Sequence, residues 1–323
     1  MQRGLVWLFV LILSSATSLA HADTFGSGVN SFEIEFVPIG HPGNPPDTTD
    51  RPVTDGAVSY IYRIGKYEIS EQMIDKANAE SATAGNPLTI THDGRGANFP
   101  STSISWFEAA RFVNWLNIST NNPPAYKFDD MGDFQLWDPN DPGYDPANLY
   151  RNKLARYFLP TLSEWHKAAY YDPVAEVYYD YPSGSDSVPD GISFPGDTVF
   201  DAVFDDGGNN LGPNEITNVG ITSPFGTFGQ GGNVREWLEI AFDRENTMPD
   251  KQRMMRGGAW GSIHTLLLAA NDGIGWAPSF EGNFVGLRVV AIPEPCPLSL
   301  VVIGLFGLPR RIEQRDYRRA KRV

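Results

Sequence analysis

Two glycine-rich runs in the last third of the chain combine residue types that suit cation binding and close backbone packing. Residues 231–237, Gly-Gly-Asn-Val-Arg-Glu-Trp, hold two glycines, an amide and a carboxylate. Glycine accepts positive φ angles, which let backbone carbonyls turn toward a hard cation such as calcium, and glutamate supplies negative charge. Residues 256–260, Arg-Gly-Gly-Ala-Trp, read as a buried strand or turn in which an arginine lies beside close-packed backbone.

The elements that must position these runs are short. Alternation of apolar and polar residues predicts strands at 32–37 and 60–64. Two helices are predicted by capping boxes, in which a Ser or Thr side chain bonds the amide three residues on and a Glu returns the bond. The boxes are Ser105-x-x-Glu108 and Thr161-x-x-Glu164. Acidic, Gly- and Pro-rich loops are expected at 119–156 and 205–210, and short strands and long loops after residue 175.

The first 22 residues have the pattern of a secretory signal peptide. A lone Arg3 precedes an apolar run at 5–13 that is too short to span a bilayer, and Ala-His-Ala at 20–22 forms a cleavage site. The alternative is a buried N-terminal helix, which would need polar periodicity. We expect an exported protein whose mature chain begins near Asp23.

Residues 293–323 resemble a PEP-CTERM sorting tail of exported bacterial proteins. Pro-Glu-Pro at 293–295 is followed by an apolar stretch at 298–308 and by an arginine-rich end. The resemblance implies transient anchoring in the inner membrane, cleavage by an exosortase-type protease, and a final place at the cell envelope, the cell surface or outside the cell. A basic tail that binds nucleic acid is the alternative, but it leaves the apolar stretch unexplained.

The remaining domain, residues 23–292, is strongly acidic. The whole chain carries 25 basic and 39 acidic residues; residues 1–22 hold one of the basic residues, and 293–323 hold seven basic and three acidic residues. The domain therefore keeps 17 basic and 36 acidic residues, a net charge of −19. Such a surface repels nucleic acid and anionic lipid and suits calcium or cationic ligands, so we expect no nucleic-acid partner.

Cysteine and histidine usage limits the chemistry of the domain. The single cysteine of the chain is Cys296, within the predicted tail. The domain thus has no thiol nucleophile, thiolate-bound metal or disulfide of its own. Four histidines of the domain are scattered without metal-ligand spacing, although a three-histidine site could still assemble in space. They are His41, His92, His166 and His264.

The domain resembles the sulfatase-modifying-factor family, which contains the formylglycine-generating enzyme. Six segments match in the family's order, including Leu-Pro-Thr-x-x-Glu-Trp and the two opening runs, which resemble Gly-Asn-Val-Trp-Glu-Trp and Arg-Gly-Gly-Ser-Trp; the segments are 64–70, 103–110, 158–165, 224–237, 256–260 and 285–290. The resemblance implies an irregular α+β fold related to C-type lectin domains, with little regular secondary structure.

The resemblance also implies calcium. It assigns a calcium ion to carbonyl and carboxylate oxygens of the first run; the expected ligands are Gly231, Gly232, Asn233, Val234 and Glu236. The alternative is that Glu236 merely pairs with Arg256. A second family calcium site would fall near residues 203–208, where Asp205 or Asp206 could substitute for the usual ligand.

The family's catalytic cysteines are not retained. The enzyme uses two cysteines that bind copper(I), and the resemblance places Ile263 and Leu268 at their positions. Aliphatic side chains cannot ligate copper or relay electrons, so we expect no copper and no catalytic residues for formylglycine formation.

Three functions remain open. The first is a calcium-stabilised, non-catalytic surface protein that binds a peptide or glycan in a groove near His264, Trp276 and Phe280, although each of these could instead serve packing. The second is an oxidoreductase of another kind, with a metal held by His264 and carboxylates. The third is a structural component of the cell envelope or matrix.

Overall fold

The computed structural model describes residues 21–49, 54–208 and 210–292. The predicted sorting tail and all but the last two residues of the predicted signal peptide lie outside these residues. The described residues belong to one unit that ends at Ile292. Within them, no helix has the length and apolarity needed to cross a membrane.

The larger sheet contains five strands in the order β1-β2-β3-β13-β6, each antiparallel to its neighbours. Strand β2 follows the predicted alternation, because Phe32, Ile34 and Phe36 are buried whereas Glu33 and Glu35 are exposed. The third strand begins two residues later than predicted. The bounds are β1 His21–Phe25, β2 Phe32–Ile39, β3 Tyr62–Gly65, β6 Tyr157–Phe158 and β13 Val290–Ala291.

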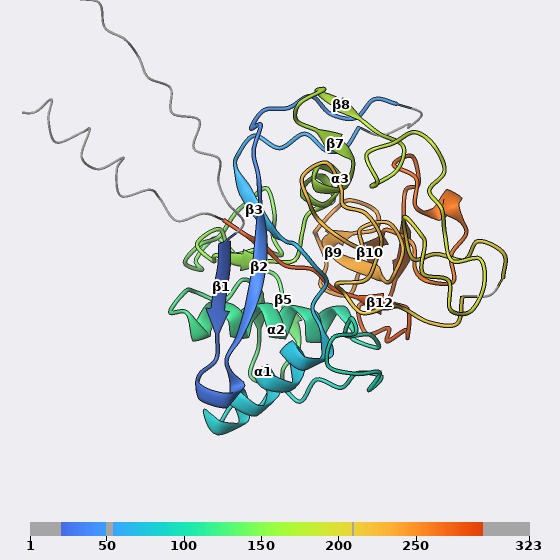
Figure 1. Cartoon of the computed structure of the whole chain (residues 1–323). Helices are drawn as coiled ribbons and strands as arrows, with labels where there is room; N and C mark the ends of the chain where they lie inside the picture. Colours follow the sequence, from blue (N-terminus) through green and yellow to red (C-terminus); the bar gives the residue numbers. More distant parts are fainter. Residues whose placement is uncertain (1–20, 50–53, 209, 293–323) are drawn as a thin grey trace, which may run out of the picture. The chain divides into compact units, whose positions relative to one another are not determined.

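The second sheet carries the two glycine-rich runs. Its order is β11-β10-β9-β12, with β12 parallel to β9 and the other pairs antiparallel. The first run leads into β9 and the second leaves β10, and these two strands lie side by side in the middle of the sheet (Figure 1). The bounds are β9 Arg235–Ala241, β10 Arg253–Arg256, β11 Ile274–Trp276 and β12 Val285–Gly286.

Three α-helices accompany the sheets: α1 Glu71–Thr83, α2 Trp106–Ser119 and α3 Leu162–Tyr170. Both predicted capping boxes are present, at Ser105 for α2 and at Thr161 for α3. Helix α1 was not predicted from the sequence. Its cap is Ser70, whose hydroxyl accepts from the Met73 amide without a returning glutamate, so the sequence lacks the full capping-box pattern there.

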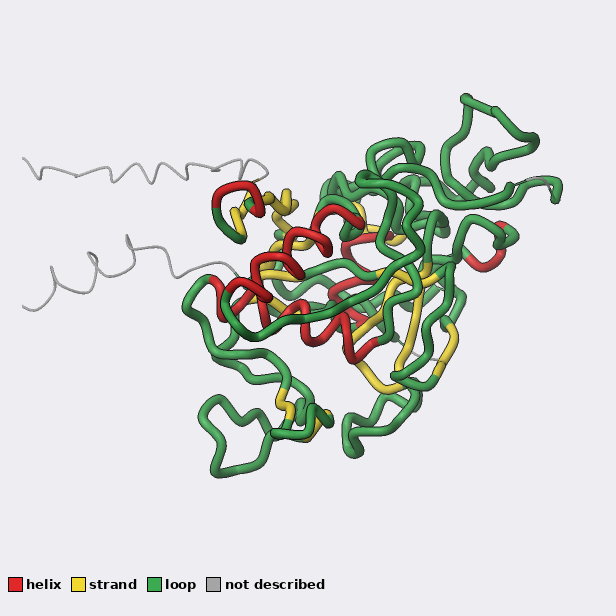
Figure 2. Tube along the Cα trace, turned by 90° about the horizontal axis from the view of Figure 1, so that it is seen from below, coloured by secondary structure: helices red, strands yellow, loops and turns green. Residues whose placement is uncertain are grey.

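Loops and turns make up most of the trace (Figure 2). This agrees with the low content of regular secondary structure expected for the fold. The remaining elements are two or three residues long, and β4 pairs with β5 and β7 with β8. Their bounds are η1 Gly28–Asn30, β4 Lys127–Phe128, β5 Phe134–Gln135, β7 Tyr171–Asp172, β8 Val177–Tyr178 and η2 His264–Leu266.

One large apolar cluster joins the helices to both sheets. The inner face of α2 packs with Phe36 of β2 and with Trp237 of β9 in this cluster. The two tryptophans at its centre also satisfy their polar atoms, since the Trp106 indole donates to the Leu238 carbonyl (3.0 Å) and the Trp237 indole to the Ile104 carbonyl (2.8 Å). The second sheet is therefore held rigidly against α2.

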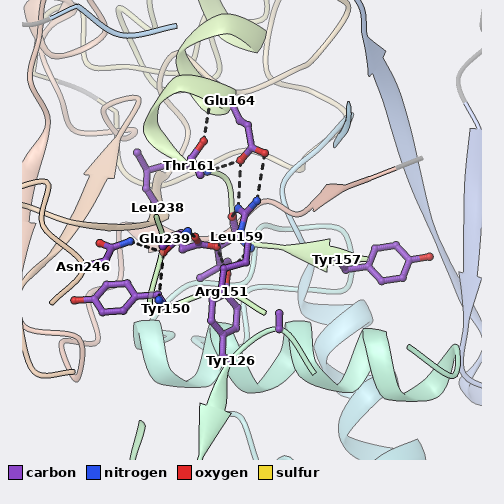
Figure 3. Close-up of polar contacts among 12 residues, drawn as sticks. Tyr126, Tyr150, Arg151, Tyr157, Leu159, Thr161, Glu164, Leu238, Glu239 and Asn246 are labelled. Carbon is purple, nitrogen blue, oxygen red and sulfur yellow. Dashed lines mark hydrogen bonds and ion pairs between the residues drawn. The ribbon is translucent and has the colours of Figure 1, made fainter. Parts of the chain in front are cut away.

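A buried ionic network ties α3 to β9 (Figure 3). The Arg151 guanidinium lies 2.7 Å from Glu239 of β9 and 3.4 Å from Glu164 of α3. The Tyr126 hydroxyl donates to Glu239 at 3.0 Å and the Tyr60 hydroxyl donates to Glu164 at 2.7 Å. Burial alone would raise the pKa of Glu164, but the charge of Arg151 and the hydrogen bonds it receives hold that pKa below its ordinary value. Burial raises the pKa of Glu239, an effect that the charge of Arg151 opposes. The contacts of Arg151 with both carboxylates fix the helix on the sheet.

Candidate functional site

The turn before β9 can be built only with glycine at its centre. Gly232 has φ +95°, and a Cβ atom there would lie 2.2 Å from the Val203 carbonyl oxygen. Its amide donates to the Gly257 carbonyl (2.7 Å), and the Asn233 amide donates to the Val203 carbonyl (2.7 Å). Asn233 itself has φ +56°, a conformation that asparagine accepts better than most residues. The first run therefore packs directly against the second and against the 203–206 segment.

The Asn233 side chain is fully used. Its Oδ1 accepts from the Asn214 amide (2.8 Å), and its Nδ2 donates to the Glu68 carboxylate (2.9 and 3.1 Å). Burial raises the pKa of Glu68 to about 8, an effect that the charge of Arg288 opposes and that of Glu236 reinforces. Glu68 is a central residue of this region that the sequence analysis did not single out.

The Glu236 carboxylate pairs with Arg288. The guanidinium donates to Oε1 from Nη2 at 2.7 Å and from Nε at 3.0 Å, and the Trp165 indole donates to Oε2 at 2.6 Å. The same guanidinium donates to the carbonyls of Gly65 (2.8 Å) and Phe228 (2.6 Å). Both charged side chains are completely buried. The expected alternative partner, Arg256, is not the one that neutralises Glu236.

These contacts decide how well the first run fits calcium. Both oxygens of Glu236 already accept hydrogen bonds, and Arg288 places its positive charge where the ion's charge would act. A calcium ion bound to Glu236 would have to displace Arg288 or Trp165, so the residues as they lie do not fit an ion at that carboxylate. Calcium binding by this run stays a prediction from the sequence.

The second expected calcium segment lies next to the first, because residues 203 and 232 form a parallel bridge. Asp205 is already engaged locally, since its Oδ1 accepts from the Gly208 amide at 2.6 Å and its own amide donates to the Ser262 carbonyl at 2.9 Å. Asp206 is exposed, and its amide donates to the Ile192 carbonyl. The structure thus brings both candidate segments and the loop after β10 together.

Arg256 is the last residue of β10, the strand that pairs with β9. It lies opposite Glu236 in the strand register, but its Nη2 is 3.2 Å from the Ala269 carbonyl and 3.4 Å from His166 Nδ1. Its guanidinium lies over the Trp165 ring, 5.4 Å from the centroid. The glycines that follow, Gly257 and Gly258, both have positive φ. The predicted arginine beside close-packed backbone is therefore confirmed.

A pocket of about 460 Å³ opens where the loop after β10 meets the start of β12. We call it the Trp260 pocket; it is lined by Arg235, Ala259, Trp260, Gly261, Ser262, Ile263, Leu266, Asn283 and Phe284. Ile263 is 59% exposed in its wall. Leu268, the second predicted replacement for a family cysteine, is half-buried and packs instead beside Tyr181, Phe204 and Leu267.

Two of the three predicted groove residues form a row of rings that leads to this pocket. Trp276 stacks on Phe280 with centroids 4.2 Å apart, and Phe280 lies 6.0 Å from Phe284, which lines the pocket. Trp276 is 38% exposed. The third predicted residue, His264, begins η2 just after Ile263, and its Nδ1 lies 2.9 Å from the Tyr181 hydroxyl.

Arg288 and Arg235 were missed as site residues for different reasons. Arg288 lies within the matched segment 285–290, but the sequence did not indicate which residue it pairs with. Arg235 was visible, because it replaces the tryptophan of the family's Gly-Asn-Val-Trp-Glu-Trp motif. That departure within an otherwise matching motif was the available signal for a residue with a role of its own.

The two sheets, the loop-rich trace and the glycine-bounded turn before β9 define an α+β domain of the formylglycine-generating-enzyme kind, related to C-type lectin domains. The chain belongs to the family described as "Sulfatase-modifying factor enzyme 1-like domain", whose profile matches residues 35–292. The fold expected from the sequence is thereby confirmed.

Individual relatives are distant. The chain is 26% identical over 305 residues to "Chaperone protein LppX" from Paenibacillus barcinonensis. The match covers 88% of this chain and 98% of that protein. The chain shares the fold of Treponema denticola variable protein 1, with a TM-score of 0.59, 19% identity, and coverage of 86% of this chain and 100% of the other. CarF is similar at a TM-score of 0.59, 20% identity, and coverage of 81% and 99%. At these identities the structural likeness establishes the fold alone.

Proposed function

We propose that this protein is an exported ligand-binding domain that does not form formylglycine. Its ligand would occupy the Trp260 pocket and the row of rings that leads to it. The observation that carries this proposal is the pocket itself, of about 460 Å³, whose wall is built by the residues that follow Arg-Gly-Gly-Ala-Trp. Its volume lies within the range of roughly 300–1,000 Å³ that small-ligand sites occupy.

The amino-acid composition of residues 23–292 excludes the family's thiol chemistry. The single cysteine of the chain is Cys296, so residues 23–292 offer no pair of thiolates to bind copper(I) and transfer electrons. This holds whichever residues of the loop after β10 align with the family's cysteines. The exposed Ile263 instead presents an apolar surface to the pocket.

The exposed Trp276 and the ring stacked on it favour a glycan over a peptide as the ligand. Trp276 and Phe280 are nearly parallel, with 21° between the ring planes, and Trp276 offers a flat apolar face with a polar indole N–H. Such faces are suited to the C–H surfaces of sugar rings, and tryptophan is enriched where binding partly desolvates a surface. A peptide remains the alternative ligand.

A glycan array probed with the purified chain tests the binding proposal. We expect retention on a subset of glycans and loss of that retention in Trp276→Ala, which removes the exposed ring. The matched control is Phe194→Ala, because Phe194 is also exposed (55%) but belongs neither to the row of rings nor to the lining of the Trp260 pocket. Equal retention of Trp276→Ala and the native chain, or no retention of either, would contradict the proposal.

A sulfatase-derived peptide that contains cysteine tests the catalytic part. After incubation with the chain in air, with and without copper, we expect the mass of its cysteine to remain unchanged. Conversion to formylglycine would overturn the proposal and revive the oxidoreductase alternative. Elemental analysis of the same preparation further distinguishes the binding function from the enzymatic one, since stoichiometric copper or iron favours an oxidoreductase of another kind that uses His264.

Export rests on the two ends of the sequence. We propose that residues 1–22 direct secretion and that residues 293–323 act as a PEP-CTERM-type sorting tail, processed by an exosortase-type protease at the membrane. N- and C-terminal mass mapping of the protein recovered from its native host would test both. Retention of residues 1–22 or a soluble intracellular product would contradict export, and the structural envelope role would then also fall.

A further inference from the structure

Arg235 is a buried cation that lacks a counter-charge. It is the first residue of β9, is only 9% exposed, and lines the Trp260 pocket. Its backbone amide donates to the Phe284 carbonyl at 2.9 Å. Within the described ranges 21–49, 54–208 and 210–292, no hydrogen bond or ion pair reaches its guanidinium, whose nitrogens are not among the fully enclosed unpaired atoms.

The other buried arginines have partners within the domain. Arg63, Arg151 and Arg288 pair with carboxylates, whereas Arg253 and Arg256 donate to backbone carbonyls and lie over aromatic rings. Burial without such a partner lowers the pKa of Arg235. A buried charge is normally compensated by an opposite charge or by hydrogen bonds, so an uncompensated guanidinium at a pocket wall points to an acceptor that comes from outside.

A second donor in the same pocket lacks an acceptor. The Trp260 indole Nε1 is buried and has no hydrogen-bond partner among the described residues. Trp260 and Arg235 both line the pocket. Buried donors are almost always paired in native proteins, so this enclosed indole N–H is a second unsatisfied donor, on a residue whose ring lines the pocket.

We propose that Arg235 and Trp260 form an anion subsite that takes the carboxylate of a sugar chain ending in a single carboxylated residue. This inference rests on the proposed glycan-binding function and names the chemical class of its ligand. A guanidinium presents a planar fork of N–H groups that matches a carboxylate, and the indole adds one further donor.

The residues around Arg235 favour a ligand that carries a single negative charge and is otherwise neutral. The domain has a net charge of −19, which repels polyanions at long range. Of the residues that the structure describes, Arg235 is the one charged side chain in the lining of this pocket, and Ser262 and Asn283 add only neutral polar groups. The described lining therefore offers no second cation for a second negative charge. The stacked Trp276 and Phe280 lie next along the row of rings and suit the neutral sugar residue that follows.

The matched ligands methyl β-glucuronide and methyl β-glucoside test the inference, because they differ only in carrying a carboxylate or a CH₂OH group. Ligand-observed NMR titration of the full chain with each sugar gives the two dissociation constants. We expect the glucuronide to bind at least about tenfold more tightly, Arg235→Met to abolish this preference, and Trp260→Phe, which keeps the ring but removes the N–H, to reduce it severalfold.

Three controls make the result interpretable. Lys153→Gln removes the same charge from an exposed position and should leave the preference unchanged. Arg235→Lys keeps the charge but loses the fork, and should bind less tightly than the native chain. Thermal unfolding of every variant verifies that it is folded.

The outcomes separate the inference from the function on which it rests. Neutral sugar binding that Trp276→Ala removes and Arg235→Met leaves unchanged would overturn the inference and keep the proposed function. Preference for a peptide with a free C-terminal carboxylate over its amide, without sugar binding, would overturn the sugar assignment, as would tighter binding of polygalacturonate than of the monoanion. Binding of none of these probes would overturn the inference, and the proposed function falls with it where the glycan array also shows no retention.

Discussion

Arg288→Met tests whether a guanidinium neutralises the buried Glu236 carboxylate. The substitution keeps much of the apolar volume of the side chain but removes the charge. Glu236 would retain only its hydrogen bond from the Trp165 indole, at 2.6 Å. The carbonyls of Gly65 and Phe228 would also lose the donor that now lies 2.8 and 2.6 Å away.

The expected cost follows from this geometry. Removal of one partner from a buried ion pair destabilises a protein by about 3–5 kcal/mol, because it leaves the other charge uncompensated. Both partners here have no exposed side-chain surface, so solvent cannot take over the lost interaction. For a domain of this size, 1 kcal/mol corresponds to roughly 2–4 °C, and we expect the melting temperature to fall by about 10 °C or more.

Circular dichroism during thermal and urea unfolding measures the change. Arg111→Met is the matched control, since Arg111 is half-buried on α2 and donates to a single carbonyl, that of Gly132; its expected cost is about 1 kcal/mol. The double variant Glu236→Gln with Arg288→Met should be less destabilised than the sum of the single variants, because their interaction is then counted once. A loss below about 1 kcal/mol in Arg288→Met would refute the reasoning.

Chelation distinguishes Arg288 from a calcium ion at the same carboxylate. If Arg288 is the counter-charge of Glu236, EDTA should leave the melting temperature of the native chain unchanged within about 1 °C. A ligand bound only to the folded state stabilises it in proportion to its saturation, so a bound ion would be seen as a fall of several degrees that added calcium reverses. Such a fall would restore the calcium expected from the sequence.

Three further predictions concern stability. The pKa of Glu68 in the folded protein is raised to about 8, so the contribution of its protonated form to folding stability is complete below the ordinary pKa near 4.5 and is lost as the pH rises toward 8. The melting temperature of the native chain should therefore fall over this pH range relative to that of Glu68→Gln. Parallel pH profiles of the two proteins would contradict this. Arg235→Met removes a buried charge without a partner and should raise the melting temperature of the ligand-free chain by a few degrees; a decrease would speak against an uncompensated cation. Thr161→Ala removes the cap of α3, whose hydroxyl accepts from the Glu164 amide at 3.2 Å, and should cost about 1 kcal/mol in urea unfolding, whereas no change would show that packing alone holds this helix end.

Local structure was largely predictable from the sequence. The capping boxes at Ser105 and Thr161 depend on residues three positions apart, and the alternation in β2 depends on neighbours two positions apart. The matched segments also placed the chain in its family and fold. Helix α1 escaped because its cap has no returning glutamate, and β3 was placed too early because the exposed Tyr60 and Ile61 extend its alternation.

Long-range partners were not predictable in the same way. Glu236 and Arg288 are 52 residues apart, and Glu236 and Trp165 are 71 apart. In the sequence, Glu236 lies nearer to Arg256, and the antiparallel register of β9 and β10 does bring these two residues opposite each other. Because the Trp165 ring lies between the charges, hydrogen-bonded to Glu236 and covered by Arg256, the nearer arginine is not the partner.

The residues of the first run therefore divide by the face of β9 on which they lie. Glu236 points to the side where Arg288 and Trp165 satisfy it. Its neighbour Arg235 lies on the opposite face, where this chain has a cation instead of the motif's tryptophan and the structure supplies neither a counter-charge nor a hydrogen-bond acceptor among the described residues. A buried charge without any such partner costs stability. Ligand binding is the role that would account for retaining it, and the opposite effects expected of Arg235→Met, a more stable chain that no longer selects a carboxylate, follow from that role.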